Sequence, residues 1–179
     1  SMLWMLISAV GFLLTDRPAI LLLLVQAILV GAALAYTLEF IRDYLNVRLS
    51  QHSPARLFGW PGLLFLVWIA IAPGFYMWNV ASMLDTGLWS SLVLFATVRM
   101  LRLAEDGPAQ RPATVSLSLL FSLMVLSRPE AIAWGLMFNG LLLVILRNSG
   151  IRGVEFWRQL LIPAASFGLT LLLLTLFRE

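Results

Sequence analysis

Three charged residues that lie between apolar segments are the candidates for chemistry in this sequence. They are Asp85, Arg128 and Glu130. A carboxylate can accept a proton from a hydroxyl group that lies within hydrogen-bond reach. The planar guanidinium of arginine donates several hydrogen bonds in a fixed geometry, which suits phosphate groups. Whether such groups can act together depends on the elements that carry them.

The composition indicates an integral membrane protein. Of 179 residues, 61% are hydrophobic and 12% are charged, and the mean hydropathy is +0.94. A soluble domain is about half apolar and about one quarter charged. One small core cannot bury this much apolar surface, so lipid is the expected solvent and the bilayer the first expected partner.

Seven apolar runs divide the chain, each bounded by charge, proline or glycine. The runs are rich in leucine and continuous, without the alternation typical of membrane strands. They predict an all-α, polytopic transmembrane bundle of about seven helices in a single domain, residues 1–179. Several runs are shorter than the roughly 20 residues that cross a bilayer, so we expect these helices to extend into their flanks. The runs are 3–14, 19–36, 57–72, 87–98, 113–126, 131–146 and 160–177.

Arginine distribution predicts the orientation. All twelve basic residues are arginine, and nine of them lie in the second, fourth and sixth connections between runs. Cytoplasmic loops retain arginine and lysine, so these three connections are expected in the cytoplasm, with the N-terminus. The first, third and fifth connections, which carry Asp85, Arg128 and Glu130, are then extracytoplasmic.

Other functional classes find little support in the composition. There is no cysteine and only one histidine, His52, so no ligand cluster for a divalent cation is visible and no cofactor is predicted. The arginines are dispersed in groups of three, which does not indicate a nucleic-acid surface.

Two segments resemble the polytopic glycosyltransferases of the GT-C superfamily, which use polyprenyl-phosphate sugars. Residues 78–88 read WNVASMLDTGL and residues 126–131 read LSRPEA. Many bacterial members carry a Ser-Gly-x-Glu-Thr-like segment on an extracytoplasmic turn and an Arg-Pro-Glu or Arg-Pro-Asp turn one hairpin later. Here Asp85-Thr86 stands in place of Glu-Thr, and Arg128-Pro129-Glu130 matches directly.

The resemblance implies transfer of sugar from a polyprenyl-phosphate donor to a glycan or protein acceptor outside the bacterial inner membrane, in the cell envelope. By analogy, Arg128 binds phosphate or organises the site, Glu130 orients Arg128, and Asp85 contacts the acceptor and is the weak candidate for a catalytic group.

One departure from the family pattern concerns the catalytic carboxylate. In that superfamily it lies on a long first extracytoplasmic loop, whereas the first such connection here is short and offers only Asp16. Ser1 before Met2, and a chain that stops directly after an apolar run, suggest a piece of a longer protein. We therefore expect the catalytic loop to lie upstream and this chain alone not to transfer sugar.

A purely structural interpretation competes with this one. Ser127 and Glu130 have the spacing of a capping box, with Pro129 in the first helical turn, and Ser82 and Asp85 repeat that spacing. Acidic residues also suit the positive end of a helix dipole. Two further alternatives for the whole chain are a fragment of a transporter or flippase and a non-catalytic membrane subunit.

The topology can be tested by labelling, because the chain has no cysteine of its own. We expect single cysteines at Gln51 or Gln110 to be protected from a membrane-impermeant thiol reagent in intact cells, and a cysteine at Met83 to react. Reaction at the first two positions with none at Met83 would contradict the orientation.

Overall fold

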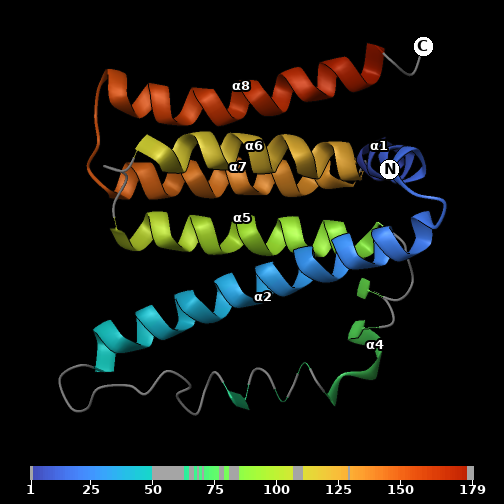
Figure 1. The fold of residues 1–179 in the computed structure, drawn as a ribbon. Helices are drawn as coiled ribbons and strands as arrows, with labels where there is room; N and C mark the ends of the chain where they lie inside the picture. The colour runs from blue at the N-terminus through green and yellow to red at the C-terminus, as the bar shows by residue number, and fades with distance from the viewer. Residues whose placement is uncertain are drawn as a thin grey trace. The chain divides into compact units, whose positions relative to one another are not determined.

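The computed structural model describes residues 2–49, 63–64, 67, 69, 71–76, 79–80, 85–106, 111–128 and 130–176. Six long helices account for most of them, with one short helix between the second and third of these (Figure 1). Within these ranges no strand is present, which confirms the all-α fold class. The helices are α1 (Met2–Leu14), α2 (Pro18–Leu49), α4 (Pro73–Tyr76), α5 (Thr86–Asp106), α6 (Arg111–Ser127), α7 (Ala131–Asn148) and α8 (Val154–Leu176).

The helices agree with six of the seven predicted apolar runs, and several extend beyond them as expected. Helix α2 reaches 32 residues and α5 reaches 21, while α1 stays short at 13 residues. Helices α2, α5, α7 and α8 are long and apolar enough to cross a membrane. Most of the run 57–72 lies outside the described residues, as do Gln51, His52, Met83 and Gln110.

The chain divides into two compact units. Unit 1 comprises residues 1–7 and 95–179, and unit 2 comprises residues 8–94. The second half of α5 therefore belongs to unit 1, and its first half belongs to unit 2.

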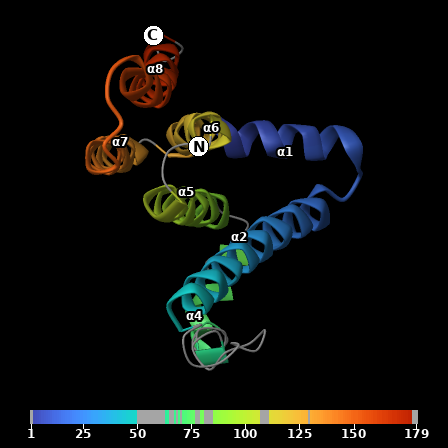
Figure 2. The ribbon, with the colours of Figure 1, turned by 90° about the vertical axis from the view of Figure 1, so that its left-hand side faces the viewer.

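In unit 1, α6, α7 and α8 pack against one another, and successive helices run in opposite directions (Figures 1 and 2). Their core is formed by aromatic and aliphatic side chains. The rings of Phe121 in α6 and Phe138 in α7 stack with centroids 5.8 Å apart. Leu117, Met124, Leu142 and Leu146 are almost fully buried around them.

A serine pair adds a polar contact between α6 and α8. The hydroxyls of Ser122 and Ser166 lie 2.7 Å apart, and the Ser166 hydroxyl donates to the carbonyl of Ser118 at 3.3 Å. Small hydroxyl residues allow helices to approach closely and to bond across their interface in an apolar medium. This serine pair links α8 to α6, while the aromatic stack joins α6 to α7.

The outer surface of unit 1 is apolar. Only 17% of the apolar stretch of α8 is buried within the protein. Leucines such as Leu136 in α7 and Leu169 in α8 are more than half exposed. An apolar surface of this extent is unsuited to water and suits lipid tails.

Glycine and proline set the ends and contacts of these helices. Helix α7 ends where Gly150 takes a positive φ of 72° and donates its N–H to the Arg147 carbonyl, a backbone geometry that favours glycine. Pro163 is buried inside α8, where it supplies no N–H for the helix ladder. Such a proline is tolerated where neighbouring helices pack around it.

Gly135 of α7 packs so closely against α8 that no side chain fits at this position. A Cβ atom placed on it would collide with the ring of Phe167, whereas nothing lies within 4 Å of a Cβ on Gly140 in the same helix. We expect Gly135→Ala to destabilise unit 1 by about 1–3 kcal/mol, as overpacked cores are. Gly140→Ala should be neutral or stabilising, since alanine favours helix by up to about 1 kcal/mol. Unfolding of both variants in detergent micelles measures this, and equal stabilities would contradict the packing.

Candidate functional site

The Asp85 turn lies immediately before α5, in unit 2. The Asp85 carbonyl accepts a hydrogen bond of 2.9 Å from the N–H of Trp89, so Asp85 occupies the capping position of the helix. Its side chain is half-buried. Ser82, the other member of the predicted capping pair, lies outside the described residues.

A buried polar cluster adjoins this turn. The Ser90 hydroxyl contacts the side-chain oxygen of Asn79 and lies 2.6 Å from the Thr86 carbonyl. The contact of Ser90 with Asn79 ties the segment before α5 to the start of this helix, and the Asn79 amide group donates in turn to the Phe75 carbonyl of α4 at 2.9 Å. The Ser91 hydroxyl donates to the Gly87 carbonyl at 2.7 Å.

Gly87 allows α2 and the segment around Asn79 to approach the start of α5. A Cβ on Gly87 would collide with the backbone carbonyl of Asn79 and with the side chain of Gln26, which is fully buried in α2. The Asp85-Thr86-Gly87 sequence thus combines a helix start with a close three-way contact.

Sequence reasoning did not identify this cluster. Gln26 is a single amide residue within the apolar run 19–36, and Asn79 lies in the segment 78–88, for which only Asp85 was a candidate. The available signal was an amide side chain within apolar sequence, since such a group in an apolar environment needs a hydrogen-bond partner.

The Arg128–Glu130 turn connects α6 to α7 in unit 1. Arg128 is half-buried, and its carbonyl accepts a hydrogen bond of 3.1 Å from the N–H of Ala131. Glu130 is exposed and stands at the N-cap of α7 with a helical backbone conformation. Pro129 lies outside the described residues.

The capping box predicted for this turn does not form. The Glu130 side chain makes no capping hydrogen bond, and the Ser127 hydroxyl donates backwards to the Met124 carbonyl at 2.7 Å. A capping box needs Ser127 at the N-cap and Glu130 three residues later in the first turn of the same helix, but α6 ends at Ser127 and Glu130 itself is the N-cap of α7. Ser127 instead satisfies its buried hydroxyl within α6. Within the described part of the chain, no hydrogen bond or ion pair of the Glu130 side chain is present, so its carboxylate is accessible.

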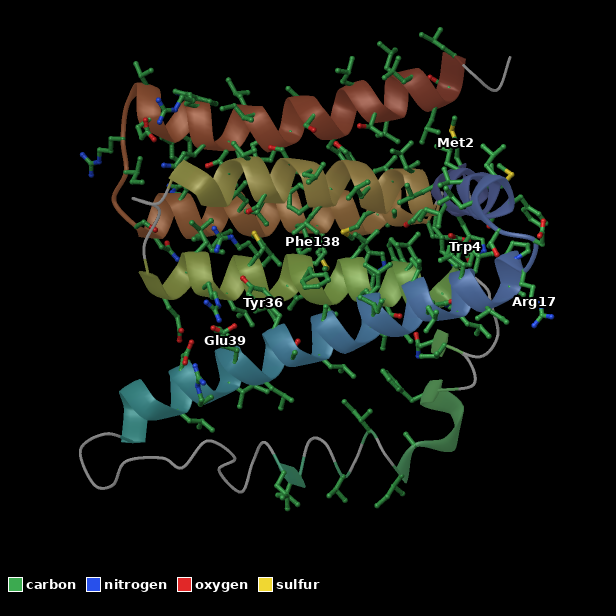
Figure 3. The ribbon with its side chains drawn as sticks, viewed as in Figure 1. Met2, Trp4, Arg17, Tyr36, Glu39 and Phe138 are labelled. Carbon is green, nitrogen blue, oxygen red and sulfur yellow. The ribbon has the colours of Figure 1, made fainter. Side chains whose placement is uncertain are left out.

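The remaining charged candidates behave as expected for local structure. Arg42 donates to the adjacent Asp43 through Nε and Nη2 at 3.1 and 2.9 Å, so these two charges form a local pair in α2. Arg17 is exposed in the turn before α2 and points away from the helices (Figure 3). Across the described ranges, no group of three histidine, aspartate or glutamate side chains that could hold a metal ion is present.

The two candidate turns belong to different units, so the sharing of one membrane face by Asp85, Arg128 and Glu130 stays a prediction. No protein family model, curated protein or solved structure matches this chain.

The packing at Gly87 can be tested directly. We expect Gly87→Ala to destabilise unit 2 by about 1–3 kcal/mol, because the backbone of Asn79 must move to admit a methyl group. Gly31→Ala is the matched control, since a Cβ on Gly31 meets nothing within 4 Å. Unfolding midpoints in detergent compare the two. A Gly87→Ala variant as stable as the control would show that the contact is loose.

Proposed function

We propose that this chain is a module of a membrane glycosyltransferase that transfers a sugar from a polyprenyl-phosphate donor to an extracytoplasmic acceptor in a bacterial inner membrane. The support comes first from the resemblance of the Asp85-Thr86 and Arg128-Pro129-Glu130 segments to the GT-C superfamily. It comes second from the state of the Arg128–Glu130 turn, which is the observation that carries the proposal.

That turn has properties suited to a lipid-linked phosphate. An arginine is half-buried at the junction of two apolar helices, beside an exposed carboxylate that helix capping does not use. Burying an arginine at the centre of a bilayer costs about 3 kcal/mol even on the lenient insertion scale, so this turn belongs near the membrane surface. The head group of a polyprenyl-phosphate sugar lies at the same level.

The chemistry assigns a different task to each side chain. The acceptor hydroxyl oxygen attacks the anomeric carbon while a carboxylate takes its proton, and the bond from that carbon to the phosphate oxygen breaks. Polyprenyl phosphate leaves with the electron pair of this bond. Arg128 binds the leaving phosphate through its fork of donors. Glu130 forms no ion pair with Arg128 in the described part of the chain, so we assign it a contact with the sugar in place of the orienting role that the resemblance implies. Asp85 contacts the acceptor and is the weak candidate for the carboxylate that takes the proton.

The proposal predicts that donor binding depends on Arg128. In phosphatidylcholine vesicles, a panel of polyprenyl-phosphate sugars with a photoactivatable chain should label the purified protein. Arg128→Gln should weaken labelling by about tenfold or more, because hydrogen bonds to charged groups contribute about 1.5–3 kcal/mol. Arg128→Lys should fall between, since lysine keeps the charge and loses the planar fork.

Arg17→Gln is the matched control, because Arg17 is an exposed arginine that also lies in a short connection. Its labelling should equal that of the unaltered chain. Equal labelling of Arg128→Gln and the unaltered chain, or equally strong competition by a polyprenol without phosphate, would refute the assignment of Arg128.

A further inference from the structure

One end of unit 1 is strongly basic. The end of α5, the start of α6, the end of α7 and the start of α8 meet there (Figure 1). Residues 99–111 and 147–158 contain six arginines and three acidic residues, which gives a net charge of +3. At the opposite end, the turn from α6 to α7 holds Arg128 and Glu130, whose charges cancel.

The arginines of this basic end differ in their partners. Arg158 donates to Glu155 at 2.6 Å, and Glu155 also accepts a hydrogen bond from Gln159 at 2.9 Å. Arg147 and Arg152 are exposed, and no described acidic side chain forms an ion pair with either. Glu155 is therefore already engaged. The guanidinium groups of Arg147 and Arg152 can bind an external anion.

A third arginine lies further from the helix ends. Arg99 is half-buried in α5 and donates from Nε to the Ser116 hydroxyl of α6 at 3.1 Å. That partner is neutral, and in the described part of the chain no carboxylate pairs with Arg99. Arg99 precedes the end of α5 by seven residues, or about 10 Å along the helix. The positive potential thus extends inward from the surface.

Exposed apolar residues follow Arg152 closely in the sequence, at the start of α8. Val154 and Trp157, in the first turns of α8, are 84% and 57% exposed. Tryptophan concentrates at the level of lipid head groups, where one side of the ring is apolar and the other is hydrated. Arginine beside exposed tryptophan is the combination expected for a surface that contacts head groups and the adjoining acyl chains.

We propose that Arg147 and Arg152, with Trp157 beside them, form a binding surface for anionic phospholipid head groups. Clusters of basic residues at the ends of membrane helices attract anionic lipids, and each basic side chain contributes about 1 kcal/mol near such a surface. The phosphodiester of phosphatidylglycerol presents oxygens that guanidinium groups bind well. The occupant is the bilayer itself and differs from the lipid-linked sugar proposed for Arg128.

The test measures lipid selectivity of the whole chain. The purified protein is equilibrated in mixed micelles with equimolar phosphatidylglycerol and phosphatidylcholine, and bound lipids are counted by native mass spectrometry. We expect a preference for phosphatidylglycerol that falls by about fivefold for each arginine removed, in Arg147→Gln, Arg152→Gln and the double variant, the fold equivalent of about 1 kcal/mol. The preference should also weaken as salt rises, because exposed charges are screened.

Three controls define the outcome. Arg17→Gln removes an exposed arginine elsewhere, Arg158→Gln removes one already paired with Glu155, and both should keep the preference. Arg128→Gln should also keep it, so failure here leaves the donor-binding proposal intact. The arginines at 147 and 152 are exposed, and unchanged unfolding midpoints will show that their variants fold. An unaltered preference in the double variant, or displacement of the lipid by millimolar inorganic phosphate, would overturn the proposal.

Discussion

The structure depends on one constraint: an apolar medium offers no water, so every polar group must find its partner within the chain. Many hydroxyl and amide donors obey it locally, although the buried Oδ1 of Asn139 has no hydrogen-bond partner in the described part of the chain. Hydroxyl and amide groups inside the helices donate to the carbonyl four residues earlier, as Thr37 does to Ala33 at 2.8 Å and Asn139 to Gly135 at 2.8 Å. Ser127 does the same over three residues. These bonds to the helix's own carbonyl groups explain how many polar side chains can occupy apolar helices without forming a site. A polar residue in such a run is therefore weak evidence for a transport path.

Between helices the same constraint selects close packing at a few positions. Lipid tails are as apolar as leucine, so apolar burial alone gives little preference for one helix partner over another. Association then relies on shape and on polar contacts. In unit 1 the flat surface at Gly135 receives the ring of Phe167, and Ser122 meets Ser166. In unit 2 Gly87 brings the buried amide of Gln26 to the start of α5.

These contacts mark the boundary of what sequence could predict. The length of each apolar run and the charged residues at its ends located six helices, because a transmembrane helix is defined by composition over about 20 residues. The capping box considered at Ser127 does not form, because Ser127 is still the last residue of α6 and Glu130 itself stands at the N-cap of α7 rather than three residues into it. The cluster of Gln26, Asn79 and Ser90 could not be predicted, since it depends on which helices approach, and many pairings are compatible with the same apolar pattern.

The failure of the capping box changes how the Arg128–Glu130 turn should be understood. A capping box would have explained Glu130 by helix stability alone, and the carboxylate would have been engaged with backbone N–H groups. In the structure the Ser127 hydroxyl bonds within α6 and Glu130 makes no capping hydrogen bond, so the Glu130 side chain acts on α7 only through the helix dipole. A carboxylate without a capping hydrogen bond, beside a half-buried arginine, is compatible with the external partner proposed for this turn. A phosphate carrying a sugar offers an anion to Arg128 and hydroxyl groups to Glu130, which a phospholipid of the bulk bilayer does not combine in the same way.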